Sequence, residues 1–211
     1  MLHELRTYTL NPGTLPAYMK ASETIGRPAR GNNYGTNHGY WYTEFGTLNQ
    51  IWHLWTYDSY AERTRLRAEL QNNERWTQEY IPAIRPLINR QDIRFLNAAK
   101  PITPPKAEGG IYELRMYRTA LGKAPAWAQA YMDVMPAREK YGHNVGLWTG
   151  EAPQPNEGFH MWNYSSVDAR IAMRKALFQD PDWHVFLQRT AGFVVEMESI
   201  LLLPTPYSAM G

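Results

Sequence analysis

Residues 4–8 read Glu-Leu-Arg-Thr-Tyr, and residues 113–117 repeat them as Glu-Leu-Arg-Met-Tyr, a shift of 109 positions. A second stretch, Trp-His-Leu-Trp-Thr-Tyr at 52–57, returns as Phe-His-Met-Trp-Asn-Tyr at 159–164, a shift of 107. Two copies of a unit of about 100 residues are too few and too long for a solenoid. We therefore predict a duplicated small domain whose copies share mostly polar and aromatic residues.

Composition excludes several classes of protein. The chain of 211 residues carries 22 basic and 20 acidic side chains, so its net charge of +2 attracts neither nucleic acid nor an acidic membrane. The lack of cysteine excludes disulfides, thiolate metal ligands and cysteine nucleophiles. No apolar run reaches membrane-spanning length, and no basic region followed by an apolar stretch opens the chain. We expect a cytoplasmic protein that does not insert into membranes.

Each copy has the pattern strand, helix, strand, strand, helix, strand. In the first copy we expect strands at 2–10, 37–45, 50–57 and 90–96, with helices that begin near Pro16 and after Ser59. This order is the ferredoxin-like arrangement, in which both helices cover one face of a four-stranded antiparallel sheet. The fold class is therefore α+β, with two ferredoxin-like (βαββαβ) repeats. Two bare sheet faces in one chain most simply cover each other.

A proline-rich stretch separates the two copies. Residues 98–110 contain three prolines and end in a glycine pair, which is typical of an extended linker. We assign the first repeat to residues 1–97, the linker to 98–110 and the second repeat to 111–204.

Strand alternation divides the repeated residues into two sets, because successive side chains point to opposite faces. Glu4, Arg6 and Tyr8 share one face of the first strand, and His53 and Trp55 share one face of the third. The layer beneath the helices must be dry, so we expect the apolar set there and the polar-aromatic set on the helix-free face. Buried charges are costly unless paired or hydrated, so that face is predicted to hold either a tight polar network or a solvated pocket.

These motifs, (Tyr/His)-Glu-Leu-Arg-x-Tyr and His-x-Trp-x-Tyr in a unit of about 100 residues, resemble the NIPSNAP family over about residues 2–97 and 111–203. The resemblance implies the dimeric α+β barrel superfamily, in which the sheets of ferredoxin-like units pack into a barrel. Related families include cofactor-independent monooxygenases, isomerases, haem-binding or haem-degrading proteins and plain ligand binders. Such a fold does not determine an activity.

Twelve repeated residues are candidates for a site. Candidates for catalysis are Glu4, Arg6 and His53 with their repeats Glu113, Arg115 and His160; candidates for ligand binding are Tyr8, Trp55 and Tyr57 with their repeats Tyr117, Trp162 and Tyr164. A histidine can act as base near neutral pH, a guanidinium can hold a developing oxyanion, and aromatic rings can surround a flat ligand. A salt-bridge network with packed rings explains the same residues without catalysis.

Two hypotheses follow for function. In the first, this is a small-molecule binding protein or cofactor-independent enzyme, of monooxygenase or isomerase type, that acts on a carbonyl-containing or aromatic compound in the barrel interior. In the second, it is a non-catalytic binding or scaffold module whose polar residues hold the two sheets together. We expect a homo-oligomer, a dimer or higher, and no metal, because no spacing supplies three ligands from one copy. We expect no cofactor; haem ligation by one histidine is an alternative that no motif supports.

Overall fold

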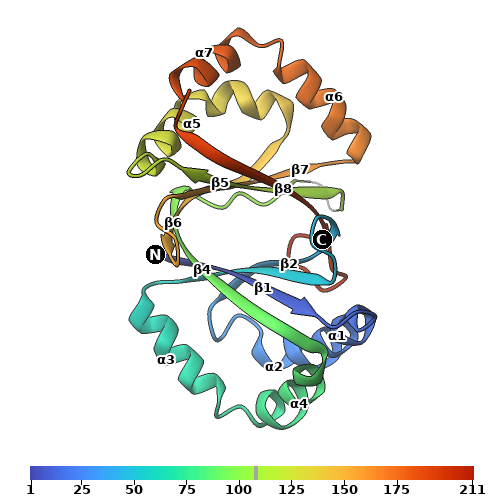
Figure 1. The fold of residues 1–211 in the computed structure, drawn as a ribbon. Coiled ribbons are helices and arrows are strands. Elements are labelled where there is room, and N and C mark those ends of the chain that lie inside the picture. Colours follow the sequence, from blue (N-terminus) through green and yellow to red (C-terminus); the bar gives the residue numbers. More distant parts are fainter. Residues whose placement is uncertain (107–108) are drawn as a thin grey trace. The chain divides into compact units, whose positions relative to one another are not determined.

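The computed structural model describes residues 1–106 and 109–211 of the chain (Figure 1). These residues form two compact units. The first unit comprises Met1–Phe95 and Leu203–Gly211, and the second comprises Leu96–Leu202. Among the described residues, no helix combines the length and apolar character needed to cross a lipid bilayer.

The first unit has the predicted order of elements. Its strands are β1 (Leu2–Leu10), β2 (Thr36–Phe45), β3 (Gln50–Tyr57) and β4 (Ile88–Lys100). Its helical segments are α1 (Leu15–Ala21), η1 (Ser22–Gly26), α2 (Arg27–Arg30), α3 (Tyr60–Leu70), η2 (Arg75–Tyr80), α4 (Ile81–Ile84) and η3 (Arg85–Leu87). β4 continues to Lys100, three residues into the segment predicted as a linker, and residues 107–108 of that segment lie outside the described residues.

The second unit repeats this order. Its strands are β5 (Ile111–Thr119), β6 (His143–Ala152), β7 (Glu157–Tyr164) and β8 (Val194–Pro204). Its helical segments are α5 (Ala124–Arg138), η4 (Glu139–Tyr141), α6 (Val167–Leu177) and α7 (Pro181–Arg189). The strands at 2–10 and 50–57 have the predicted bounds, because each is an apolar or aromatic run that ends at turn residues.

The strand order within each unit is that of a ferredoxin-like sheet. Neighbouring strands run β4-β1-β3-β2 in the first unit and β8-β5-β7-β6 in the second. The helices α1 to α4 lie on one face of the first sheet, and α5 to α7 lie on one face of the second (Figure 1). The antiparallel register sets Arg6 opposite His53 and Arg115 opposite His160 on the central strands.

The prediction of which residues face the helices was wrong. Glu4 is paired with Arg63 of α3, and the Arg30 guanidinium of α2 lies 3.4 Å from the Trp55 ring centroid. The polar-aromatic set therefore lies beneath the helices, and the apolar set, which includes Leu5 and Leu54, is buried on the opposite face. The reason is that the helices supply arginines and rings that pair with the polar strand residues, so this layer excludes water without being apolar.

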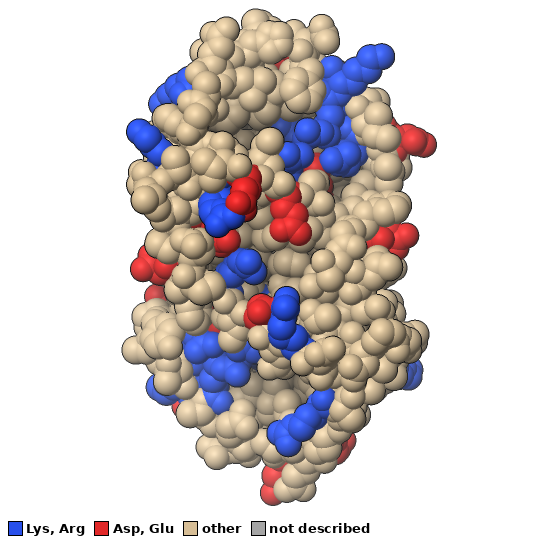
Figure 2. Space-filling model, viewed as in Figure 1, with Lys and Arg blue, Asp and Glu red and all other residues tan. Residues whose placement is uncertain are grey.

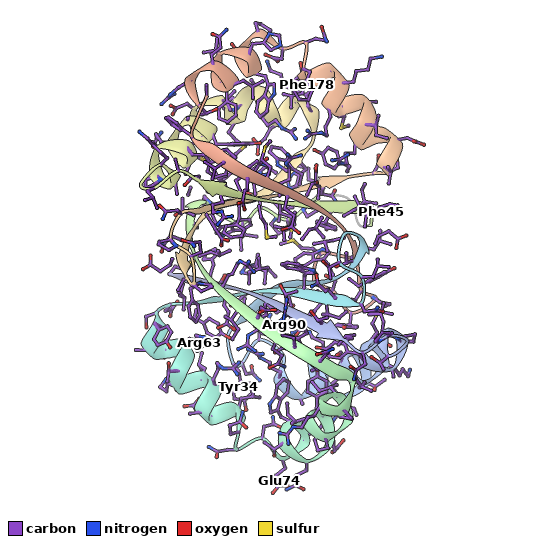
Figure 3. All side chains as sticks on the ribbon, viewed as in Figure 1. Tyr34, Phe45, Arg63, Glu74, Arg90 and Phe178 are labelled. Carbon is purple, nitrogen blue, oxygen red and sulfur yellow. The ribbon has the colours of Figure 1, made fainter. Side chains whose placement is uncertain are left out.

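Serine caps fix the starts of α3, which carries Arg63, and of α6, which carries Arg170. The Ser59 hydroxyl accepts a hydrogen bond from the Glu62 backbone N–H at 3.1 Å, and the Ser166 hydroxyl accepts one from Ala169 at 3.0 Å. Each cap satisfies one of the free N–H groups at a helix start. Four residues into each helix stands an arginine that contacts the strand glutamate, and Figure 3 shows Arg63 on α3 beside the strands of its unit.

Candidate functional site

The second unit contains a charge network between its sheet and α6. The Glu113 carboxylate on β5 accepts hydrogen bonds from Arg170 at 2.5 Å, from the Ser199 hydroxyl at 2.7 Å and from Arg115 at 3.2 Å. Burial opposes ionisation of Glu113, but the Arg170 and Ser199 hydrogen bonds and the Arg115 charge outweigh it and lower the pKa to about 2. Glu113 is therefore a fixed carboxylate and a poor proton acceptor.

His160 on β7 is held as a neutral imidazole. The Trp162 indole N–H donates to His160 Nδ1 at 2.6 Å, and His160 Nε2 lies 3.1 Å from the Tyr117 hydroxyl. Burial first, and then the charges of Arg115 and Arg138, lower the pKa of His160 well below its ordinary value. Because the indole can only donate, Nδ1 is unprotonated and the ring proton is on Nε2. The role of general base predicted for His160 does not fit this arrangement.

A cavity of about 380 Å³ opens beside this network, between the sheet and the helices of the second unit. Its polar lining residues are Arg115, Tyr117, Arg138, His160 and Arg174. Its apolar lining includes Trp127, Tyr131, Phe178, Trp183, Phe186 and Met197. Three of the lining side chains are cationic, and no described carboxylate lines the cavity. The volume falls in the range of sites for small organic ligands.

Arg174 is a cation of this cavity without a counter-ion among the described residues. It lies one helical turn after Arg170 on α6 and is half-buried, and its guanidinium contacts the Phe178 ring at 5.9 Å. No carboxylate pairs with it in the part of the chain that the structure describes. Burial and the nearby Arg115 charge lower its pKa, which is the direction expected for an uncompensated cation. Figure 2 shows Lys and Arg side chains gathered beside α6.

The arginines that the helices contribute to the site were not predicted from the sequence, and they include Arg30 and Arg138 as well as Arg170 and Arg174. The Arg138 guanidinium of α5 lies 3.7 Å from the Trp162 ring centroid and donates to the Tyr164 hydroxyl at 2.9 Å. Arg30 of α2 repeats this arrangement on Trp55 and Tyr57, at 3.4 and 2.8 Å. A signal was available, since Pro-Ala-Arg occurs at 28–30 and again at 136–138.

The first unit holds the equivalent residues in a different environment. The Trp55 indole donates to His53 Nδ1 at 2.6 Å, but His53 Nε2 is buried without a hydrogen-bond partner among the described residues. The Tyr40 ring stacks on His53 at 4.9 Å and contacts the Tyr207 ring at 5.2 Å. Leucine at 147 replaces Tyr40 in the second unit, where the cavity lies.

The twelve predicted site residues therefore form two groups of six, one in each unit. Each group brings its carboxylate, guanidinium, imidazole, indole and two phenols together, but beneath the helices instead of on the helix-free face. Within each unit these polar residues tie strands to helices, and the scaffold hypothesis stays a prediction. Among residues 1–106 and 109–211, no group of three His, Asp or Glu side chains is arranged to hold a metal ion.

Both halves of the chain match one protein family. The NIPSNAP family model matches residues 3–101 and again residues 112–209. The chain belongs to the NIPSNAP family. Protein NipSnap homolog 3A of Homo sapiens is 27% identical over 219 residues, which cover 100% of this chain and 86% of that protein. The Dictyostelium discoideum NipSnap homolog is 27% identical over 209 residues, which cover 96% of this chain and 87% of that protein.

Solved structures confirm the fold class of this NIPSNAP protein. A candidate monooxygenase from Lactobacillus acidophilus NCFM matches with a TM-score of 0.72 at 13% identity, over 99% of this chain and 95% of that one. An anthrone oxidase-like protein matches with a TM-score of 0.67 at 11% identity, over 100% and 94%. The predicted α+β class of two ferredoxin-like repeats is thus confirmed, and likeness at such low identity establishes the fold alone.

Proposed function

We propose that this NIPSNAP protein binds a small aromatic or carbonyl-containing compound with a negatively charged oxygen in the cavity of its second unit. One observation carries the proposal: the cavity beside His160 is lined by Arg115, Arg138 and Arg174 and by no described carboxylate. Because Arg174 is half-buried and has no counter-ion among the described residues, an anionic ligand would gain a charge-assisted hydrogen bond there.

The aromatic lining supports the other half of this description. Trp127 and Tyr131 stand on α5, and Trp183 and Phe186 stand on α7, where their rings stack with centroids 4.7 Å apart. Flat apolar walls of this kind favour a flat ligand, because aromatic rings prefer stacked or edge-on contact. The ligand class is therefore an aromatic acid, an ionised phenol or an enolised aromatic ketone.

A second candidate is cofactor-independent oxygenation or isomerisation of such a compound. The observation that favours it is the Tyr117 hydroxyl, polarised by Arg115 and His160, which would stabilise an enolate or phenolate by donating a hydrogen bond. Neither Glu113 nor His160 is suited to take a proton, so a substrate would have to ionise readily by itself. Anthrone, a flat aromatic ketone, is a suitable test compound, and catalysed oxygen uptake would support this candidate.

The test of binding is calorimetric titration with 2-naphthoate, a flat aromatic carboxylate. We expect one site per chain, and we expect Arg174→Gln to weaken binding by about tenfold, because one charge-assisted hydrogen bond is lost. Arg67→Gln is the matched control, since Arg67 stands at the equivalent position of α3 in the first unit. No binding to the wild-type chain, or equal weakening by both variants, would contradict the proposal.

The cytoplasmic location and homo-oligomeric state expected from the sequence remain predictions. We further propose that the ligand enters past Phe178 and Met197, which line the cavity and are 46% and 69% exposed. Figure 3 marks Phe178 at the end of α6, where the chain turns toward α7.

A further inference from the structure

The Tyr117 hydroxyl on β5 lies at the wall of the cavity and has two hydrogen-bond partners. Arg115 Nε lies 2.6 Å from it, and His160 Nε2 lies 3.1 Å from it. Within residues 1–106 and 109–211 no third partner of this hydroxyl is found. The protons on these two nitrogens decide what the phenol can do.

Both partners are donors. A guanidinium Nε–H only donates. The His160 Nε2 proton follows from the other side of the ring, where Nδ1 accepts from the Trp162 indole at 2.6 Å. A neutral imidazole that accepts at one nitrogen carries its proton at the other, so His160 Nε2–H also donates to Tyr117.

A phenol oxygen accepts through two lone pairs and donates one proton. With both acceptor positions filled by Arg115 and His160, the Tyr117 proton points to a third group, and the cavity is the space beside it. We infer that Tyr117 is a specificity-determining residue that donates its phenolic hydrogen to an oxygen acceptor of the ligand, with an anionic phenolate or enolate oxygen preferred. This inference rests on the proposed function and specifies the group that the cavity recognises.

The two donors also explain the preference for an anionic oxygen. Hydrogen bonds in a chain polarise one another, so a phenol that accepts from a guanidinium and an imidazole becomes a stronger donor. Burial raises the pKa of Tyr117 despite the Arg115 charge, so the phenol keeps its proton at neutral pH. A ligand oxygen gains most from such a donor when it carries negative charge.

The first unit lacks this device in its described residues, although the residue types are the same. The Tyr8 hydroxyl accepts from Arg6 Nη1 at 2.7 Å, and His53 Nε2 has no partner there. The Tyr8 and His53 rings meet edge to face at 4.8 Å, an arrangement that leaves the hydroxyl off the imidazole proton. The phenol that accepts two hydrogen bonds is therefore found in the second unit, beside the cavity.

The test uses 4-nitrophenol, whose visible absorption reports its ionisation. We expect the wild-type chain to bind it as the phenolate, so that bound probe ionises at lower pH than free probe. In Tyr117→Phe, which keeps the ring, we expect affinity for the probe to fall about tenfold. We also expect the pKa of the bound probe to return toward that of the free probe. Tyr141→Phe is the control: it removes a phenol that donates to Asp180 at 3.0 Å, outside the cavity lining.

The outcomes separate this inference from the proposed function. If wild type and Tyr117→Phe bind 4-nitrophenol with equal affinity and the same ionisation, the role of Tyr117 is overturned while the binding site stands. If the wild-type chain binds neither 4-nitrophenol nor 2-naphthoate, both are overturned.

A second measurement needs no folded variant. Nitrogen NMR of histidine-labelled wild-type protein identifies the His160 tautomer. We expect the proton on Nε2, and a proton on Nδ1 would overturn the inference.

Discussion

Arg138 is a single side chain that makes several contacts beneath the helices of the second unit. It is 1% exposed, donates to the Tyr141 carbonyl at 3.0 Å and to the Tyr164 hydroxyl at 2.9 Å, and covers the Trp162 ring. A planar guanidinium can make these contacts at once, whereas a lysine ammonium is a compact charge without a stacking face. Arg138 is therefore a structural cation that also forms part of the cavity wall.

We predict that Arg138→Lys lowers the free energy of unfolding by about 1–3 kcal/mol, since a buried hydrogen bond and a cation–π contact are lost. Urea unfolding followed by tryptophan fluorescence measures this change. The control is Arg189→Lys, whose ion pair with Asp133 lies at the surface and contributes less than about 1 kcal/mol. Equal costs for the two variants would contradict the structural role of Arg138.

At the scale of elements, α6 joins the cap, the charge network and the cavity. Its first turn is fixed by Ser166, its next residues present Arg170 to Glu113, and Arg174 one turn later reaches the cavity. α3 repeats this design in the first unit with Ser59, Arg63 and Arg67. Because side chains four apart share a helix face, one cap positions both arginines of each helix.

Ser166→Ala removes the cap of α6 and leaves an N–H group unsatisfied. We predict a loss of about 1 kcal/mol in the free energy of unfolding together with weaker binding of 2-naphthoate, because the helix end that holds Arg170 and Arg174 is loosened. Ser59→Ala is the matched variant in α3, where we predict a similar loss of stability and unchanged binding. Thermal unfolding and calorimetric titration of both variants provide the comparison, and unchanged binding by Ser166→Ala would refute the coupling.

At the scale of the whole molecule, the duplication produced two layers of polar and aromatic side chains, one between the sheet and the helices of each unit. The two layers differ at several positions. Tyr40 stacks on the imidazole of the first unit and shares a buried cluster with Tyr80, and leucines at 147 and 187 replace these two tyrosines in the second unit. Tyr131 of the second unit occupies the position of Ser22 in the first. Aromatic rings therefore stand at different positions in the two units. The cavity beside His160 lies in the unit with the two leucines.

Buried histidines make the stability of the whole molecule sensitive to acid. Burial lowers the pKa of His53 and His160 well below the ordinary value and lowers that of His3 to about 4. Unfolding returns each to about 6.5, so the unfolded chain binds more protons below that pH. The stability that the folded protein gains from these neutral histidines is complete above pH of about 6.5. It is lost as the pH falls toward the pKa values of the histidines in the folded protein.

We therefore predict that the free energy of unfolding falls between pH 7 and pH 5, by up to about 1.4 kcal/mol per pH unit for each such histidine. A second loss begins below pH of about 4.5, where Glu4 and Glu113 of lowered pKa begin to hold fewer protons than in the unfolded chain. Urea unfolding at half-unit pH steps measures both. A constant free energy between pH 7 and pH 5 would show that these histidines are not buried as neutral rings.

The sequence alone determined the duplication, the order of elements, the bounds of the central strands and the family. It also determined which residues share a strand face, because strand alternation is a local property of the backbone. The spacing of two positions was enough to place Glu4 with Arg6 and His160 with Trp162.

The face that those residues occupy depends on how the helices pack against the sheet. Alternation separates two sets of side chains but does not say which set meets the helices. That choice depends on four helix arginines that neutralise or cover the polar-aromatic set: Arg63, Arg30, Arg170 and Arg138. They stand 26 to 59 residues away in sequence from their strand partners. The sequence did not predict the cavity either, because an empty volume depends on how closely the side chains of several elements pack together.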